Sequence, residues 1–385
     1  WDKYSIEPMT KALSWQDTRA QNIVNEFSNH SDWIWEKTGA PLSPNFGGPK
    51  FLHMIRKHPG LRKKVLSSQV FYGPLSAYLT HALTGIATID ESIAGRTLFF
   101  NIHSSDWSKK CMNLFQIPAS GLPLLRPVLY DHGSICDTNL SLDCVIGDQQ
   151  AALIGQEGLL RGSIATNFGT SASVLYNTGG NPIVVNGLIS SVLFSDGKQR
   201  KHVVEGTINA CNSLFHHLET ELNISHDFMK WHELCSNQST NGIYVPGFAG
   251  LAAPYWKSGF NDIYRNLDKY DKNKIIRAGM ESIGFLVNNI IDRLKPIMES
   301  KIKSLSASGG SARQPLLQFI ADLTGIPVTH SAMKDQTAYG VFRLLRSKND
   351  NDDDYQISQT FSPQQDRAEI ENKLSDWQET IESIL

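Results

Sequence analysis

The sequence predicts an α/β protein, and two observations support this class. Runs rich in β-branched and apolar residues, such as 163–167 and 171–176, alternate along the chain with longer segments of helical spacing. Residues 274–295 carry the clearest helical stripe of apolar side chains. The 385 residues suggest two or three domains of ordinary size. A change of composition near residues 155–162 marks the domain boundary that we expect.

The composition is that of a globular chain and excludes several classes of partner. Its 36 Lys and Arg residues against 38 Asp and Glu give a net charge of −2, which argues against a nucleic-acid binder. No apolar run approaches ~18 residues, so we expect no membrane span. The five cysteines form no CxxC pair, which favours the reducing cytoplasm over a zinc ribbon or a disulfide scaffold.

In the first half of the chain, turn residues separate short apolar segments. Pro74 suits the first turn of a helix that Gly85 ends. The apolar run 142–146 suits a buried strand, because Gly147 interrupts it and a helical segment follows. We expect helices at residues 19–26, 49–57, 74–83 and 149–154 and strands at residues 10–15 and 142–146.

The second half has more β-rich segments and longer helices. We expect strands at residues 163–167, 171–176 and 202–205 and helices at residues 274–295, 315–323 and 337–345. Asp271 or Asn273 can cap the start of the longest helix. Glu281 and Asp335 are expected as helix-surface carboxylates. The run 349–354 lacks the Gly and Glu of a calcium-binding loop, so we expect a solvated loop there.

Three glycine-containing turns carry the functional signal, at residues 147–150, 167–171 and 308–311. Glycine lets backbone N–H groups approach a phosphate closely, and a following helix adds partial positive charge. A hydroxyl of Thr170 or Ser171 can donate to a phosphate oxygen. Taken alone, each is more often an ordinary turn than a phosphate site, and none forms a Walker A loop or a GxGxxG motif.

The order of these turns and of the segments around them resembles the FGGY carbohydrate kinases, the family of glycerol, pentulose and heptulose kinases. The first two turns read Gly-Asp-Gln-Gln-Ala-Ala-Leu-Ile-Gly-Gln and Asn-Phe-Gly-Thr-Ser, in the family's order. The resemblance extends over nearly the whole chain through residues 12–20, 88–97, 245–256, 274–284, 308–322 and 337–340.

This resemblance implies an actin-like, ribonuclease-H-like ATPase fold with two α/β domains and a cleft between them. Residues 1–155 would form the sugar-binding domain and residues 156–385 the nucleotide-binding domain. The chain starts at Trp1 with residues that resemble those after the family's opening strands and Asp-x-Gly-Thr loop, so we expect that loop before Trp1. The implied reaction is the ATP- and Mg²⁺-dependent phosphorylation of a hydroxyl of a small sugar or polyol.

The resemblance makes Asp148 the catalytic carboxylate. Phosphoryl transfer through a loose transition state needs an acceptor hydroxyl held in line with the phosphate. A carboxylate within hydrogen-bond reach orients that hydroxyl and receives its proton. The same side chain would hold Mg²⁺, directly or through water. Outside this motif order, Asp148 is more typical of a turn-capping aspartate.

The other two turns match the family's nucleotide contacts. We expect contacts from Gly169, Thr170, Ser171, Gly309, Gly310 and Gln314, with Gln318 as the alternative to Gln314. The first three would meet the β- and γ-phosphates, and the glycine pair would pass close to the α-phosphate and adenosine. Asn266 stands where family members have a glycine, and asparagine tolerates the positive φ that such a turn requires.

The acceptor would lie against residues that match the family's sugar contacts. They are Trp15, Gln16, Asp17, Asn45, Phe46 and Gln149. Trp15 would stack on a carbon skeleton and Asp17 would accept sugar hydroxyls, the alternative being a buried Trp with a turn Asp. In glycerol kinases the position of Asn45 holds a tyrosine and that of Ser173 a phenylalanine. The smaller residues here favour a ketose, pentulose or heptulose, over glycerol.

Other interpretations stay open at this stage. A non-catalytic sugar or nucleotide sensor on the same scaffold would lack the opening loop, whereas an enzyme would keep it. The sequence leaves the oligomeric state open, with a homodimer as one alternative. Cys211 and Cys235 are expected to have no chemistry.

Overall fold

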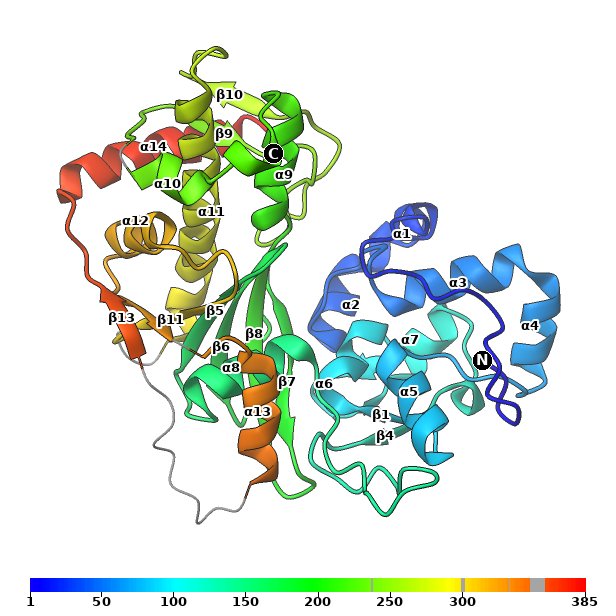
Figure 1. The fold of residues 1–385 in the computed structure, drawn as a ribbon. Helices are drawn as coiled ribbons and strands as arrows, with labels where there is room; N and C mark the ends of the chain where they lie inside the picture. The colour runs from blue at the N-terminus through cyan, green and yellow to red at the C-terminus, as the bar shows by residue number, and fades with distance from the viewer. Residues whose placement is uncertain (237, 299–301, 332, 347–356) are drawn as a thin grey trace.

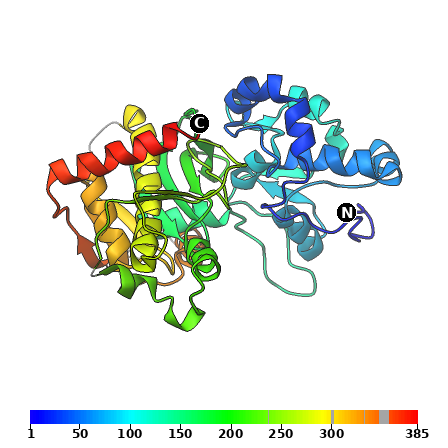
Figure 2. The same cartoon turned by 90° about the horizontal axis from the view of Figure 1, so that it is seen from above.

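The computed structural model describes residues 1–236, 238–298, 302–331, 333–346 and 357–385. These residues form two lobes that lie side by side, the first coloured blue to cyan and the second green to red (Figure 1). Seen from above, the N-terminus lies on the first lobe and the C-terminus on the second (Figure 2). Among the helices of the described residues, none combines the length and the apolar character that crossing a bilayer requires.

The first lobe consists mainly of short helices packed around aromatic side chains. Phe99 packs edge-on against both Phe51 and Phe115 in its buried core. The helices are α1 (Gln21–Glu26), α2 (Ser31–Thr38), α3 (Gly47–Lys57), α4 (Pro59–Leu66), α5 (Leu75–Thr84), α6 (Glu91–Ala94) and α7 (Lys109–Leu114), with short 3-10 turns η1 (Ser28–His30), η2 (Gly95–Thr97) and η3 (Ala119–Gly121). Strands β1 (Thr88–Asp90) and β4 (Leu124–Arg126) pair in parallel, and β2 (Phe100–Asn101) pairs antiparallel with β3 (Asp106–Trp107).

A large mixed sheet forms the centre of the second lobe. Over the described residues it has seven strands in the order β13-β12-β11-β5-β6-β8-β7. Neighbours β5, β11 and β12 are parallel, and the other pairs are antiparallel. The strands are β5 (Ile164–Phe168), β6 (Ala172–Gly179), β7 (Ile189–Ser195), β8 (Arg200–Ile208), β11 (Leu305–Ser308), β12 (Val328–Ser331) and β13 (Ile357–Phe361), while β9 (Ile243–Val245) and β10 (Ile263–Arg265) pair separately.

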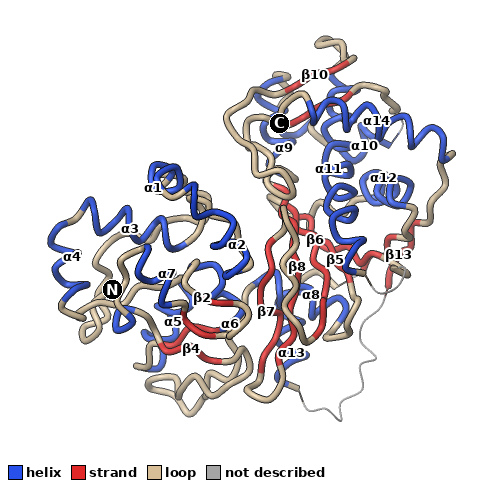
Figure 3. Tube along the Cα trace, turned by 180° about the vertical axis from the view of Figure 1, so that it is seen from behind, coloured by secondary structure: helices blue, strands red, loops and turns tan. Residues whose placement is uncertain are grey.

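Helices cover both faces of this sheet (Figure 3). They are α8 (Asp148–Glu157), α9 (Asn212–Glu221), α10 (Trp231–Ser236), α11 (Lys272–Leu294), α12 (Gln314–Thr324), α13 (Gln336–Leu345) and α14 (Arg367–Glu382), with 3-10 turns η4 (His226–Phe228) and η5 (Lys295–Ile297). Because strand side chains alternate, Phe168 and Val174 face the core shared with α11 and α12. Ala165 and Leu175 face the opposite core, which α8 and α13 complete.

Most elements that the sequence predicts are confirmed. Every predicted helix is present within a few residues of its expected ends, and so are the predicted strands of the second half. Asp271 caps α11 by accepting a hydrogen bond from the backbone N of Lys274 at 3.1 Å. Residues 349–354 lie outside the described residues.

The strands predicted at residues 10–15 and 142–146 are wrong. Residues 10–15 are irregular backbone without a partner strand in the described part of the chain. Residues 142–146 are extended, but they make only an isolated bridge between Leu129 and Cys144. An apolar run predicts a strand only when a neighbouring strand supplies the hydrogen-bonding partners, and here that partner is a loop.

The expectation for Glu281 is also wrong, because its carboxylate is buried inside the second lobe. The side chain is 1% exposed and binds Nε of Arg277 at 2.7 Å and Nζ of Lys373 at 3.0 Å. This buried ion pair joins α11 to α14. Asp335 caps α13 through the backbone N of Ala338 at 2.9 Å.

Helices α8 and α13 approach each other through glycines. A Cβ atom on Gly340 would overlap the carbonyl oxygen of Ala151 and would lie 2.7 Å from its carbonyl carbon. A Cβ atom on Gly155 would overlap the carbonyl oxygen of Gln336. Backbone atoms cannot move aside as a flexible side chain can, so this spacing requires glycine on both helices.

We predict that Gly340→Ala lowers the free energy of unfolding by about 2–3 kcal/mol, because the added methyl group forces α13 away from α8. Gly60→Ala on α4 is the control, since a Cβ atom there meets nothing within 4 Å. Alanine is favoured over glycine inside a helix, so the control should be neutral or stabilising. Urea denaturation measures both, and equal effects of the two substitutions would contradict the proposed close contact.

Candidate functional site

The predicted catalytic turn lies at the start of α8. Gly147 has extended backbone and precedes Asp148, the first residue of the helix. A Cβ atom on Gly147 would lie 2.7 Å from Cδ1 of Ile93, so the chain passes close to the first lobe there. Asp148 is exposed, and its Oδ1 accepts a hydrogen bond from the backbone N of Gln149 at 2.8 Å. The structure thus presents a carboxylate to solvent at a helix N-terminus, where negative charge is favoured.

A buried chain of hydrogen bonds from the first lobe holds this turn. Asp90 is fully buried and caps α6 by accepting from the backbone N of Ser92 at 3.0 Å and of Ile93 at 3.2 Å. The Ser92 hydroxyl donates to Asp90 and accepts from the backbone N of Gly147 at 2.9 Å. Burial raises the pKa of Asp90 to about 6, although hydrogen bonds from Ser92 and Ile93 oppose this shift.

Asp90 and Ser92 are site-supporting residues that sequence reasoning missed. They lie within the segment 88–97, which contributed only to the family resemblance. The Asp-x-Ser spacing is a local signal for a helix cap and could have pointed to a structural role. Their contact with Gly147 joins residues 55 positions apart, and no local pattern predicts it.

A cavity of about 430 Å³ opens between the two lobes. Its lining includes Trp15, Gln16 and Asn45 from the first lobe and Asn209, Leu251 and Trp256 from the second. The cavity therefore brings together three residues that the sequence singled out for the acceptor. A space with walls on both lobes becomes smaller when the lobes close, so it suits a ligand that closure encloses.

Lys50 fixes the first-lobe wall of this cavity. Its ammonium group is almost completely buried and donates to the carbonyl oxygens of Ser14 at 2.6 Å and Asn45 at 2.9 Å, with Trp15 O at 3.3 Å. Burial lowers the pKa of Lys50, and the nearby carboxylate of Asp17 opposes that shift. One side chain thus holds the loop that carries Trp15 next to the loop that carries Asn45.

Trp256 forms the rigid wall on the second lobe. Its indole N–H donates to the carbonyl oxygen of Gly187 at 2.9 Å. Its ring packs edge-on against Trp35, whose own indole N–H donates to the carbonyl oxygen of Leu188 at 2.9 Å. Sequence reasoning missed Trp256 as a cavity residue, because a cavity that it lines together with Trp15 forms only when the two lobes meet.

The other predicted acceptor residues do not line this cavity. Asp17 binds Arg19 at 2.7 Å, and this contact lowers the pKa of the Asp17 carboxyl. Phe46 is buried in the first-lobe core, next to α3. Gln149 lies beside Asp148, and its buried Oε1 has no hydrogen-bond partner among the described residues. That oxygen is an acceptor which a ligand hydroxyl could satisfy.

Ion pairs join the segment 90–96 of the first lobe to β8 of the second lobe. Arg200 of β8 binds Glu91 of α6 through two hydrogen bonds of 2.7 Å. Arg96 binds Glu205 of β8, and the Glu205 carboxylate also accepts from the Ser173 hydroxyl at 3.2 Å. Both glutamates are buried. The Ser173 hydroxyl is therefore engaged in this network, and Ser173 does not line the cavity. Its small side chain thus gives no support to the expectation of extra space for a larger acceptor.

The two predicted nucleotide turns meet at the end of β5. The backbone N of Ser311 donates to Phe168 O at 3.0 Å. Gly309 has φ +97°, and a Cβ atom on it would lie 2.6 Å from Oδ1 of Asn167. Gly169, Thr170 and Ser171 form the hairpin tip between β5 and β6. Thr170 and Gly310 are exposed there.

The start of α9 completes this cluster of turns. The backbone N of Asn212 donates to Gly169 O at 3.0 Å, and Ser311 Oγ donates to Asn212 Oδ1 at 3.2 Å. Glycine-rich backbone near a helix N-terminus can hold an anion such as phosphate. Sequence reasoning missed Asn212 as a residue of this cluster.

The remaining nucleotide candidates lie near α12 and before α11. Gln314 is exposed at the first position of α12. Gln318 donates to Asp322 at 3.0 Å and to Ser362 O at 2.8 Å, so its amide is already engaged. Asn266 has φ +54°, so this asparagine occupies the left-handed conformation that we expected it to tolerate.

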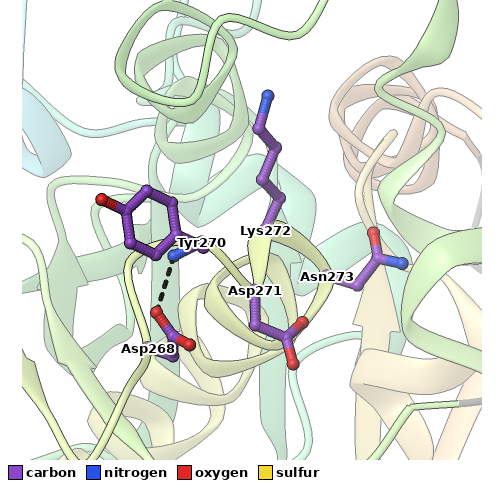
Figure 4. A pocket seen from close by; sticks show the side chains of 5 residues that line it. All are labelled: Asp268, Tyr270, Asp271, Lys272 and Asn273. Atoms are coloured by element: carbon purple, nitrogen blue, oxygen red, sulfur yellow. Dashed lines mark hydrogen bonds between the residues drawn. The ribbon is translucent and has the colours of Figure 1, made fainter.

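A separate hollow at the N-terminus of α11 lies on the open surface (Figure 4). Five residues of one short segment line it, namely Asp268, Tyr270, Asp271, Lys272 and Asn273. Asp268 accepts a hydrogen bond from the backbone N of Tyr270 at 3.0 Å, which closes the turn. None of the predicted site residues lines this hollow, so we assign it no function.

Comparison with known proteins shows one family over most of the chain. The model described as "FGGY family of carbohydrate kinases, N-terminal domain" matches residues 1–141, and the model of the C-terminal domain of that family matches residues 164–345. Glycerol kinase 2 of Saccharolobus solfataricus is 30% identical over 404 residues, covering 100% of this chain and 81% of the relative. Glycerol kinase of Limosilactobacillus reuteri is 29% identical, covering 99% of this chain and 80% of the relative.

Solved structures show the same fold. Plasmodium falciparum glycerol kinase with ADP matches with a TM-score of 0.87 at 26% identity, covering all of this chain and 81% of that chain. A ligand-bound xylulose kinase from Lactobacillus acidophilus matches with a TM-score of 0.79 at 20% identity, covering 97% of this chain and 78% of that chain. The second likeness supports the fold alone.

We predict a pH-dependent stability difference between Asp90→Asn and the wild type. The folded pKa of Asp90 is raised from 3.8 to about 6, so the folded state holds this proton more tightly than the unfolded state. The stabilisation by this proton is complete below the unfolded pKa and is lost as the pH rises through the folded pKa. As the pH rises from 4 to about 6.5, the wild type should lose up to about 3 kcal/mol of its free energy of unfolding through this group. The Asn variant has no such proton, so its free energy of unfolding should rise by that amount relative to the wild type. Chemical denaturation at several pH values measures this, and a difference that stays constant with pH would contradict it.

Proposed function

Because the chain belongs to the FGGY family of carbohydrate kinases, which phosphorylate an alcohol group with ATP, we propose that Asp148 orients the acceptor hydroxyl and takes its proton. The observation that carries this proposal is the exposed Asp148 carboxylate at the start of α8, on a turn that Ser92 holds from the first lobe. A fixed carboxylate can hold a hydroxyl in line with the transferred phosphate, which is the main requirement of this chemistry.

The hydrogen-bond chain behind the turn supports this role. Ser92 accepts from Gly147 N and donates to Asp90, so the backbone before Asp148 cannot move without breaking a buried hydrogen bond. Precise placement contributes more to phosphoryl transfer than a strong base does. Closure of the lobes would exclude water, which would otherwise take the phosphate in place of the acceptor.

We place the nucleotide in the second lobe, at the turns that meet beyond β5. Thr170 and Ser171 offer hydroxyl donors, and Gly309 and Gly310 let the chain pass close to a phosphate. Asp148 fits a role as Mg²⁺ ligand, because its carboxylate is exposed and Mg²⁺ binds carboxylate oxygens and water. When bound, Mg²⁺ would neutralise phosphate charge.

The acceptor is a small polyol or sugar in the cavity between the lobes. The relatives named glycerol kinase favour glycerol, and they give no support to a preference for ketoses. The cavity of about 430 Å³ and the short side chain of Asn45 leave space for a longer chain. Trp15 and Trp256 offer apolar surfaces for the carbon skeleton, and the orphan Oε1 of Gln149 offers an acceptor for a hydroxyl.

We predict that Asp148→Asn lowers kcat for phosphoryl transfer by at least ~10²-fold, because the amide cannot receive the proton. Asp143→Asn is the matched control, since Asp143 is an exposed carboxylate five residues earlier that binds Ser141. Coupled ADP release with full-length protein measures both variants. Near-full activity of Asp148→Asn would show that another group is the base. A wild-type protein that binds sugar and ADP without turnover would favour the sensor alternative.

A second prediction concerns the acceptor. Asn45→Tyr narrows the cavity and should lower kcat/KM for pentuloses and heptuloses about 10-fold or more relative to glycerol. Asn113→Tyr on the exposed face of α7 is the control. The assay compares glycerol, pentuloses and heptuloses with wild type and both variants. Equal effects of Asn45→Tyr on all acceptors would show that this wall does not contact the acceptor.

A further inference from the structure

We infer that His216, Glu219 and His226 form a binding site for a divalent transition-metal ion, with Zn²⁺ as the ion that fits best. His216 and Glu219 lie on α9 and His226 lies on η4, in the second lobe. One ligand atom from each side chain can be chosen so that all three lie within 4.8 Å of one another. These residues take no part in the phosphoryl transfer proposed above, so the site does not depend on that function.

The carboxylate of Glu219 bridges the Nδ1 atoms of the two imidazole rings. One of its oxygens is 2.8 Å from Nδ1 of His226, and the other is 3.3 Å from Nδ1 of His216. The two rings stack with centroids 5.6 Å apart and planes 21° apart. His216 and Glu219 face the same side because they are three residues apart on a helix. Both Nδ1 atoms therefore face one carboxylate, and small shifts would allow one ion to contact all three groups.

The neighbouring residues support a ligand role for His216. Its second ring nitrogen, Nε2, lies 3.2 Å from the side-chain amide nitrogen Nδ2 of Asn212, one turn earlier on α9. Metal-bound histidines commonly donate the proton of the free ring nitrogen to an acceptor, and Asn212 can supply one when its side-chain amide turns to present Oδ1. His217 points elsewhere and binds Asp262 at 2.6 Å, so it is not a fourth ligand.

The donor set selects the class of ion. Two imidazoles and one carboxylate are the three protein ligands of many zinc sites, in which water completes the coordination. The His226 side chain is 76% exposed and that of His216 is 53% exposed, so water can reach the open positions. Mg²⁺ and Ca²⁺ prefer oxygen ligands, which makes them poor fits here. Cu²⁺ would compete with Zn²⁺, because nitrogen sites bind it at least as tightly.

Isothermal titration of Zn²⁺ into full-length protein without a polyhistidine tag tests the site. A Cys136→Ser background removes the exposed thiol, which could bind Zn²⁺ by itself. We expect one Zn²⁺ per chain, a Zn²⁺-dependent rise of Tm, and an affinity at least 10-fold lower in His226→Asn and in Glu219→Gln. His58→Asn, at an exposed histidine on the first lobe, should leave binding unchanged.

The proposal is overturned if no Zn²⁺ binds with unit stoichiometry near pH 7.5, or if binding survives both His226→Asn and Glu219→Gln. Either result would mean that the cluster is only a set of His–Glu hydrogen bonds. Circular dichroism of each variant without metal shows whether it is folded. A variant that fails to fold is replaced by His216→Asn, for which the same loss of Zn²⁺ affinity is expected.

A consequence for the nucleotide turns follows, and it rests on the proposed function. An ion on Nδ1 of His216 leaves the ring proton on Nε2, which faces the donor Nδ2 of Asn212. The Asn212 amide must then turn so that Oδ1 accepts this proton. That oxygen already accepts from Ser311, next to the Gly309–Gly310 pair. Zn²⁺ should therefore lower ADP affinity several-fold in the wild type but not in His226→Asn. Zn²⁺ binding without this change would overturn the link and not the site, whereas a protein that binds no ADP without Zn²⁺ would contradict the proposed function.

Discussion

The hydrogen bond between the Ser92 hydroxyl and the backbone N of Gly147 is the contact on which the arrangement of the site depends. It connects the first lobe to the residue that precedes α8, and it leaves Asp148 exposed at the helix start. Because Ser92 also donates to the buried Asp90, the donor and acceptor groups of this hydroxyl are both used. The turn is thereby held by buried polar groups, which are expensive to separate from one another.

The same short segment, from Asp90 to Arg96, supplies the charged contacts between the lobes. Glu91 binds Arg200, and Arg96 binds Glu205. The first lobe is thus attached to β8, the strand next to the edge strand β7 of the large sheet. Ion pairs with a buried carboxylate contribute little net stability, because desolvation of that carboxylate offsets the attraction. Each charged group must lie within hydrogen-bond distance of its one partner on the other lobe. This requirement fixes how the lobes meet and where the cavity between them forms.

The sequence predicted local elements best where one pattern decided the outcome. The apolar stripe along 274–295 forms the expected helix, and the β-rich runs of the second half form the expected strands. In each case the local pattern of apolar side chains was enough to predict the element. The strand expected at 142–146 depended on a partner that the sequence did not show, and the chain there pairs with a loop. Glu281 was expected at the surface because an isolated glutamate usually is exposed. Its burial depends on Lys373, which lies 92 positions away.

The sequence by itself determined the family, the order of the glycine turns, and the position of Asp148 at the start of a helix. These features depend on short runs of residues, and their spacing can be recognised in the sequence without knowledge of the fold. Only the tertiary structure decided that Lys50 holds two loops together, that Trp256 and Trp15 line one cavity, and that Ser173 is engaged by Glu205. Such contacts join residues far apart in the chain, and their geometry is set by how the two lobes pack, which no local pattern encodes.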